Sequence, residues 1–434
     1  MAGPATSGTP LGPLGPLGPL GARLRDAGLT ARALAAWAGT ARLSAVPARL
    51  DAMPARPTTP AGAILALWLA GDPVPRGQLR TLSDATIDEL TAHGLIARDG
   101  DQLRARVAIA PLGAAFVVCD RLDAPVERDL VCWPDDSSYH LASAIPAALD
   151  AVAGADLPGG SGGSGGSAGR AGRRARWLDL GCGSAFAPLA RPELALQIRG
   201  VDLNERAVRY ARLGAALSGL AHLTVAPGDL GDLGTVTEVG DNVGDRGGFG
   251  EPADHVGDRG GFGEPADLVT CNAPIPDPAP DLAPDPASTP APDPASTPAP
   301  DPASTPAPDP AIRVISTPPS GIYHPINTIS QASWIPEIWR HAEPGFFARL
   351  WPALRRAVRP GGLIVVHAAI EALVPALASA GGERVIVRYT PDPARGFAIA
   401  WWRPDAPARF VATHRALTAD RPHLEPRDRD DALA

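Results

Sequence analysis

Two hydrophobic patterns alternate along the second half of the chain. Continuous apolar runs, typical of strands buried on both faces of a sheet, occupy residues 175–180, 196–202, 223–226, 267–271 and 363–367. Between them, residues 205–217 and 346–358 have the periodicity of amphipathic helices. Buried strands that alternate with helices predict an α/β fold with a parallel sheet covered on both faces. Two later runs, 384–389 and 397–402, flank a Pro-rich turn and predict an antiparallel hairpin that ends the sheet.

The first half predicts a separate, smaller domain over residues 22–122. Its residues 61–70 are strongly apolar. Ser83 is a suitable N-cap for a helix over 84–93, and Gly94 would end that helix. A second helix is expected over about 140–152, between the two domains.

A hairpin follows the helices of the small domain. Two strand-like runs, 95–98 and 102–110, flank Asp99-Gly100-Asp101, which has hairpin-turn chemistry, and the order predicts a winged-helix-like domain. Such domains often bind nucleic acid, and others serve as dimerisation or docking platforms. If this one binds nucleic acid, the phosphate contacts would be Arg76, Arg80, Arg98, Arg104 and Arg106. Asp84 and Asp88 oppose such contacts.

Low-complexity sequence separates and interrupts these domains. A Leu-Gly-Pro repeat opens the chain, a Gly/Ser run joins the domains, and two tandem repeats rich in Pro or Gly are expanded loops that cannot pack a core. The expected segments are a disordered lead (1–21), the small domain (22–122), a connecting segment (123–158), a linker (159–175), the sheet domain (176–404) with inserts 234–265 and 276–318, and a tail (405–434).

Composition narrows the classes of function. The net charge of −8 over 434 residues gives no global positive field for nucleic acid or membrane surfaces. Four cysteines without a CxxC pair favour neither a disulfide framework nor a metal site. No secretory signal and no apolar run of roughly 18 residues is found, so a cytoplasmic protein without membrane association is expected.

Candidate chemistry gathers where the predicted parallel strands end. The first strand runs into Gly181-Cys182-Gly183-Ser184, a turn whose missing side chains let a ligand approach the backbone. Asp202 ends the next strand and is placed to accept from ribose hydroxyls, and Asp229 follows the third strand, near an adenine position. Phe186 occupies the sixth position of the turn, where a dinucleotide site needs Gly or Ala.

The order of motifs adds a family resemblance. The segments LDLGCGSAF, GVDLNERAVRYARLGAALSGL, GDL, ADLVTCNAPI and LRRAVRPGGLIVV follow one another through residues 176–404. This order resembles class I S-adenosylmethionine (SAM)-dependent methyltransferases, and best matches the small-domain N-methyltransferases, which include HemK-type glutamine and rRNA guanine-N2 methyltransferases. The resemblance implies a Rossmann-like sheet that ends in an antiparallel hairpin, with SAM as cofactor.

The resemblance also implies roles for single residues. Asp179 and Gly181 would lie against the methionine part of SAM, with Cys182 and Gly183 lining the site. The ribose would be bound by Asp202 and its neighbour Leu203, and the adenine by Asp229.

Asn272, Ala273 and Pro274 occupy the reacting edge, where the family has Asn-Pro-Pro followed by Tyr or Phe. The Asn272 side chain and the Ala273 carbonyl would hold the target NH2 group, and Asn272 would also lie against SAM. Ile275 departs from the family's aromatic residue, so it offers no ring for stacking a planar acceptor. Tyr323, Trp334 or Phe346 could supply such a ring instead, although each is also a plausible packing residue.

Three functional hypotheses follow. The first is methyl transfer to an amino or amide nitrogen of a macromolecule, either a protein glutamine or an rRNA base, in the ribosome or a release factor. The second is a small-molecule methyltransferase, which the acidic charge and Ile275 favour. The third is a SAM-binding regulator without catalysis. The polar run Asp135 to Tyr139 is interpreted as a helix N-cap rather than as part of the site.

Overall fold

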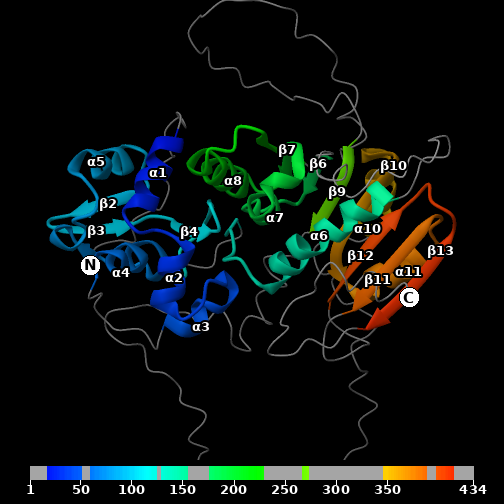
Figure 1. Ribbon diagram of the computed structural model, residues 1–434, viewed down its shortest axis with the longest axis horizontal. Coiled ribbons are helices and arrows are strands. Elements are labelled where there is room, and N and C mark those ends of the chain that lie inside the picture. The colour runs from blue at the N-terminus through cyan, green and yellow to red at the C-terminus, as the bar shows by residue number, and fades with distance from the viewer. Residues whose placement is uncertain are drawn as a thin grey trace, which may run out of the picture.

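The computed structural model describes residues 17–50, 59–124, 129–154, 175–228, 266–272, 346–388 and 397–414. Both predicted inserts and most of the predicted linker lie outside these residues. The described elements form an N-terminal module, defined here as residues 17–124, and a large sheet with its helices (Figure 1). Within this part of the chain, no helix is long and apolar enough to cross a membrane.

The large sheet has eight strands in the order β13-β11-β12-β10-β9-β6-β7-β8. The strands are β6 Ala175–Leu180, β7 Ala195–Asp202, β8 Leu223–Pro227, β9 Ala266–Asn272, β10 Val358–Ala369, β11 Glu383–Arg388, β12 Phe397–Arg403 and β13 Arg409–His414. Only β12 is antiparallel, and it pairs with β10 on one side and β11 on the other. The predicted α/β sheet and its antiparallel hairpin are confirmed, but the hairpin does not end the sheet, because β13 pairs beyond it.

Strand β13 contradicts the prediction that residues 405–434 are only a tail. It pairs in parallel with β11 at the edge of the sheet, from Arg409 opposite Glu383 to His414 opposite Arg388. An edge strand has one partner and little buried surface, and Phe410 is 40% exposed. The segment therefore lacks the continuous apolar run by which the buried strands were predicted.

Helices cover both faces of the sheet, as predicted. One face packs Trp177, Leu268, Val365 and Trp401 in a hydrophobic core with α6 (Asp136–Gly154), α7 (Phe186–Ala190) and α8 (Glu205–Ser218). The other face packs Leu178, Val269, Ile364 and Trp402 with α10 (Phe346–Ala357) and α11 (Ile370–Ser379). The predicted helices over 140–152, 205–217 and 346–358 correspond to α6, α8 and α10.

The N-terminal module combines short helices with two small sheets. Its elements are α1 Gly18–Asp26, α2 Ala31–Ala38, η1 Leu43–Ala45, α3 Pro47–Leu50, α4 Pro60–Leu65, η2 Ala66–Ala70, β1 Val74–Pro75, η3 Arg76–Gln78, α5 Asp84–Ala92, β2 Ile96–Asp99, β3 Gln102–Ala105, β4 Ala108–Leu112 and β5 Ala115–Cys119. The Ser83 hydroxyl accepts a hydrogen bond from the Thr86 amide at 3.2 Å, which confirms the predicted N-cap of α5. Strands β1, β3 and β2 form a three-stranded sheet.

One predicted strand of the module is wrong. The apolar run 102–110 is two strands, because the chain leaves the β2–β3 hairpin after Ala105 and starts a second hairpin at Ala108. In that hairpin, β4 pairs with β5, which was not predicted. All five residues of β5 are buried, so its sequence carries no alternation to mark a strand.

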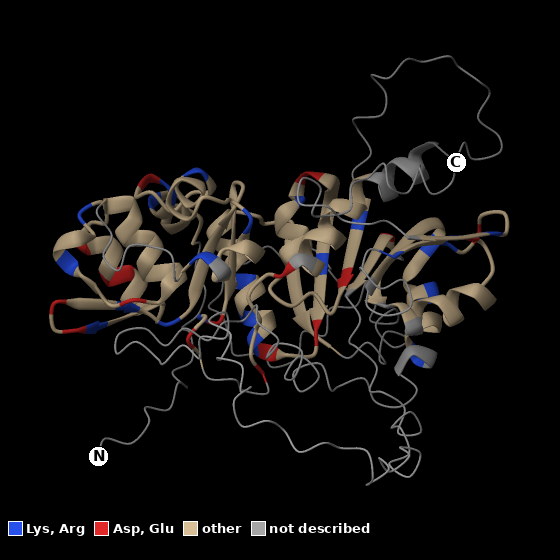
Figure 2. Cartoon of the chain, turned by 90° about the horizontal axis from the view of Figure 1, so that it is seen from below, with Lys and Arg blue, Asp and Glu red and all other residues tan. Residues whose placement is uncertain are grey.

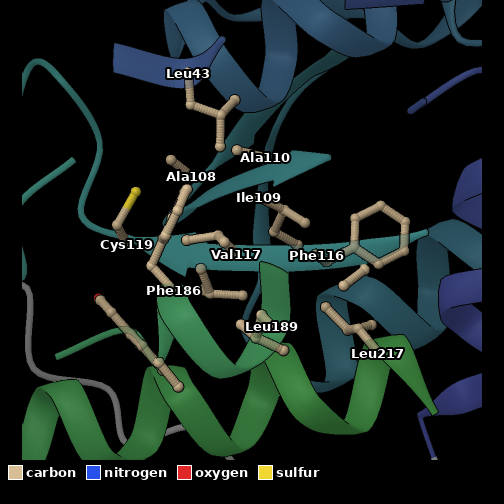
Figure 3. Close-up of a cluster of buried hydrophobic side chains, with 14 of the residues drawn as sticks. Leu43, Ala108, Ile109, Ala110, Phe116, Val117, Cys119, Phe186, Leu189 and Leu217 are labelled. Atoms are coloured by element: carbon tan, nitrogen blue, oxygen red, sulfur yellow. The ribbon is translucent and has the colours of Figure 1, made fainter. Parts of the chain in front are cut away.

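The β4–β5 hairpin joins the module to the large sheet. Figure 3 shows Phe116 and Val117 of β5 in one cluster of buried side chains with Leu189 of α7 and Leu217 of α8. The Phe116 amide donates to the Ser218 hydroxyl at 2.9 Å, and a Cβ placed on Gly214 of α8 would lie 2.9 Å from the Phe116 carbonyl oxygen. The two parts share one continuous hydrophobic core. The predicted division into a small domain ending at 122 and a sheet domain starting at 176 did not anticipate this shared core.

Helix α1 contradicts the predicted disordered lead (1–21) over residues 17–21, and residues 1–16 lie outside the described residues. Leu17, Leu20 and Leu24 are fully buried, at intervals that place them on one helix face. Gly21 lies so close to α8 that an added Cβ would be 1.8 Å from the Leu217 carbonyl oxygen. The end of the repeat therefore packs, because Gly21, which follows the last Leu-Gly-Pro unit, lets two helix backbones approach, and Pro19 suits a first helical turn.

This contact gives the first prediction. Replacing Gly21 with Ala should lower the free energy of unfolding by about 1–3 kcal/mol, because the steric cost exceeds the gain in helix propensity. Gly18→Ala is the matched control, since a Cβ there meets nothing closer than 3.8 Å. Urea denaturation measures both variants, and equal midpoints would contradict the packing of α1 on α8.

Candidate functional site

The glycine turn after β6 presents bare backbone at the edge of the sheet. Gly181 and Gly183 have φ values of 65° and 54°, in the left-handed region that favours glycine. The amides of Gly181 and Cys182 both donate to the Val201 carbonyl, at 2.8 and 3.1 Å, which fixes the turn against β7. A Cβ on Gly183 would meet no atom within 4 Å. The backbone here is both rigid and open to a ligand.

Asp202, at the end of β7, is brought directly onto this turn. Its Oδ2 accepts from the Gly183 amide at 2.7 Å, and its Oδ1 accepts from the Asn204 amide at 2.8 Å. Burial raises the pKa of Asp202, while these two amide hydrogen bonds oppose the rise. The structure thus brings two of the predicted site residues, Gly183 and Asp202, into hydrogen-bond contact.

Asp179 lies one strand away and is buried, with only 3% of its surface exposed. Its Oδ1 accepts from the Thr270 hydroxyl at 2.5 Å, and that hydroxyl accepts from Trp177 Nε1 at 2.7 Å. Burial raises the pKa of Asp179 to about 7, and the nearby Asp202 carboxylate adds to the rise. Sequence reasoning missed Thr270, which the register of β6 and β9 places opposite Asp179.

Neither Asp179 nor Asp202 forms an ion pair within the described residues. Both carboxyl groups are hydrogen-bonded to neutral donors only. A buried carboxylate without a counter-charge is costly, so the arrangement favours a ligand that is cationic or rich in hydrogen-bond donors.

The remaining predicted lining residues differ in their placement. Cys182 is 8% exposed, and burial raises the pKa of its thiol, which leaves the thiol protonated and suited to packing rather than reaction. Leu203 is 60% exposed and offers an apolar surface beside Asp202. All four cysteines are free thiols, and no cluster of three or more potential metal ligands occurs in the part of the chain that the structure describes.

The predicted reacting edge is only partly within the described residues. Strand β9 ends at Asn272, whose backbone is in register with His367 of β10. Ala273, Pro274 and Asp229 lie outside the described residues. His367, which sequence reasoning missed, is 2% exposed, and burial lowers its pKa to about 3, so its imidazole is neutral at physiological pH.

The arginines predicted to contact phosphate are largely engaged elsewhere. Arg76 pairs with Asp84, Arg98 with Asp88, and Arg104 with Asp123 at 3.3 Å. Figure 2 shows basic and acidic residues interspersed over the N-terminal module, without a continuous basic face in that view. These pairs offset the charge that a nucleic-acid interface would need.

Comparison with solved structures gives distant similarities to methyltransferases. TrmN from Thermus thermophilus is 13% identical, with 53% of this chain and 44% of that chain covered and a TM-score of 0.25. The ribosomal protein L11 methylase from Lactobacillus delbrueckii is 11% identical, with 60% and 78% covered and a TM-score of 0.27. A SAM-dependent methyltransferase from Thiobacillus denitrificans, in complex with S-adenosyl-L-homocysteine, is 15% identical, with 51% and 46% covered and a TM-score of 0.20.

The chain spans less than half of the TrmN and Thiobacillus chains. No protein-family model and no curated protein sequence matches it. The assignment of the fold therefore rests on the sheet order and strand directions described above.

The raised pKa of Asp179 gives the second prediction. The pKa of Asp179 is higher in the folded than in the unfolded state. The free energy of unfolding therefore falls as pH rises from about 4 to 7, because the unfolded state ionises this carboxyl group first. Asp179→Asn should therefore increase the free energy of unfolding by about 1–3 kcal/mol at pH 8, and by much less at pH 4. Urea denaturation at both pH values measures the difference.

Asp99→Asn, on the exposed β2–β3 hairpin, is the control and should change stability little at either pH. A gain from Asp179→Asn that is the same at pH 4 and pH 8 would show that Asp179 does not titrate between them.

Proposed function

We propose that the protein is a SAM-dependent methyltransferase that transfers a methyl group to an amino or amide nitrogen of a macromolecule. The observation that carries this proposal is the pair of uncompensated carboxyl groups, Asp179 and Asp202, on either side of an open glycine turn. The turn lies at the carboxyl ends of β6 and β7, in the middle of a largely parallel sheet. Ligands of open α/β sheets bind at that edge.

The residues present fit SAM. Asp202 would accept from the ribose hydroxyls, and the exposed Leu203 would cover an apolar face of the nucleoside. Gly181, Cys182 and Gly183 would line the pocket, and Asp179 would face the cationic methionine part. That part offers a positive charge which the described residues do not supply to either carboxylate. Asp229 would lie near the adenine.

When bound, SAM supplies an electrophilic methyl group on a sulfonium. The protein's task is then to position the acceptor nitrogen rather than to activate it with a strong base. Asn272 ends the strand next to β6, so its amide and the Ala273 carbonyl would orient the acceptor NH2 group, with Pro274 holding the turn. The neutral imidazole of His367, one strand further, would add no charge repulsion to this edge.

A small-molecule acceptor is the alternative, favoured by the net charge of −8 and by Ile275 in place of an aromatic residue. A non-catalytic SAM-binding regulator is the least favoured reading. The N-terminal module is proposed to be winged-helix-like. Its arginines that pair with aspartates argue against nucleic-acid binding by this module. A protein or rRNA substrate, and a cytoplasmic location, remain our working assignments.

The third prediction separates cofactor binding from methyl transfer. Asp202→Asn should weaken the binding of S-adenosylhomocysteine at least about tenfold, because an amide replaces one ribose acceptor with a donor. Asn272→Ala should lower this affinity far less than Asp202→Asn does, but should abolish transfer of labelled methyl groups from SAM to ribosomes or protein extract of a deletion strain. Titration calorimetry and label incorporation measure the two effects.

Glu193→Gln is the matched control for Asp202→Asn, because Glu193 precedes the opposite end of β7 and pairs only loosely with Arg191, at 3.9 Å. It should change neither property. Undiminished turnover by Asn272→Ala would refute the assignment of Asn272, and label incorporation into small molecules alone would favour the alternative acceptor.

A further inference from the structure

A segment of the chain crosses from one side of the candidate site to the other. We call residues 129–140 the strap. At its first end, the Asp129 carbonyl accepts from Asn204 Nδ2 at 2.8 Å, and the Asp129 carboxylate lies 3.0 Å from Arg206 Nε. The backbone N–H of Asn204 donates to Asp202 Oδ1. Asn204 therefore links the start of the strap to Asp202, the carboxylate that would hold the ribose.

The second end of the strap reaches the glycine turn. The Tyr139 ring packs edge-on against Phe186, with ring centroids 4.7 Å apart, and Phe186 is three residues after Gly183. Asp135 fixes the same end, since its Oδ1 accepts from the Ser138 amide at 3.1 Å as the predicted N-cap of α6. The strap thus contacts a residue near each partner of the Gly183–Asp202 hydrogen bond: Phe186, near Gly183, and Asn204, near Asp202.

One buried carboxylate, Asp120, holds the strap to the sheet domain. Asp120 is 7% exposed and accepts from the Val131 amide of the strap at 2.7 Å. It also accepts from the Tyr210 hydroxyl at 2.8 Å and from Arg206 Nη1 at 3.3 Å, both on α8. Arg206 therefore bridges Asp120 and Asp129, and the strap is tied to α8 at two points.

The strap is also tied to the N-terminal module through both backbone groups of one residue. Trp133 Nε1 donates to the Leu43 carbonyl at 2.7 Å, and the Leu43 amide donates to the Tyr139 hydroxyl at 2.8 Å. These bonds tie η1 of the module to the strap. The module thereby helps to set the position of the strap.

We propose that the strap is the fixed outer wall of the SAM pocket and that Asp120 is a positioning residue for cofactor binding, an inference that rests on the proposed function. Burying a carboxylate and a guanidinium is costly unless each is fully bonded, and a loop needed only as a connection would not require it. A wall fixed before the cofactor arrives lowers the ordering cost of binding.

The test measures S-adenosylhomocysteine binding by calorimetry on the full chain. Asp120→Asn should weaken binding roughly five- to twentyfold, because the loss of charge removes one of the two carboxylates that Arg206 bridges and loosens the strap. Tyr139→Phe tests the other end, because it keeps the ring on Phe186 and removes the hydroxyl that accepts from the Leu43 amide; a smaller loss of affinity is expected. Circular dichroism confirms that each variant is folded at the temperature of the titration.

Two controls separate positioning from a general loss of stability. Glu89→Gln removes a carboxylate from the Arg23–Glu89 ion pair, which lies within the N-terminal module, and Gly21→Ala destabilises the contact of α1 with α8. Both should lower the melting temperature and leave the affinity unchanged. Unchanged affinity in folded Asp120→Asn, beside a wild type that binds, would overturn the strap proposal alone. A wild type that binds neither SAM nor S-adenosylhomocysteine would overturn the proposed function and the strap proposal together.

Discussion

The site depends on two carboxyl groups, the buried Asp179 and the partly buried Asp202, to which the fold gives no counter-charge among the described residues. Asp179 is held by Thr270 and Asp202 by the backbone of the glycine turn, so both are bonded to neutral groups only. The raised pKa of each records the cost of this arrangement. An amide at position 179 would make the unliganded protein more stable than the carboxyl group does. A donor-rich cationic ligand would offset the cost of keeping the carboxyl group.

Much of the sheet could be predicted because its strands are buried on both faces and are therefore continuous apolar runs. The same logic placed Gly183 and Asp202 at one edge, where the structure finds them in contact. Strand β13 escaped because an edge strand lacks such a run. Thr270 escaped because its partnership with Asp179 is a matter of strand register, which no local pattern encodes.

The N-terminal module could be predicted element by element but not in its relation to the sheet. Its β4–β5 hairpin packs on α7 and α8, and Leu20 and Gly21 extend the contact into residues whose repeat suggested disorder. These contacts join residues about a hundred positions apart, such as Phe116 and Ser218, so hydrophobic periodicity could not reveal them. The module is therefore part of the architecture around the site rather than a detachable appendage.

The central claim is that Asp179 and Asp202 form part of a binding site for a cationic ligand. Its most direct test is calorimetric titration of SAM at pH 7 in two buffers with different ionisation enthalpies. The account predicts that binding releases protons from the wild type, since a cation would lower the raised pKa of Asp179, and that Asp179→Asn removes this release. Binding heats that are the same in both buffers, or no binding at all, would contradict it.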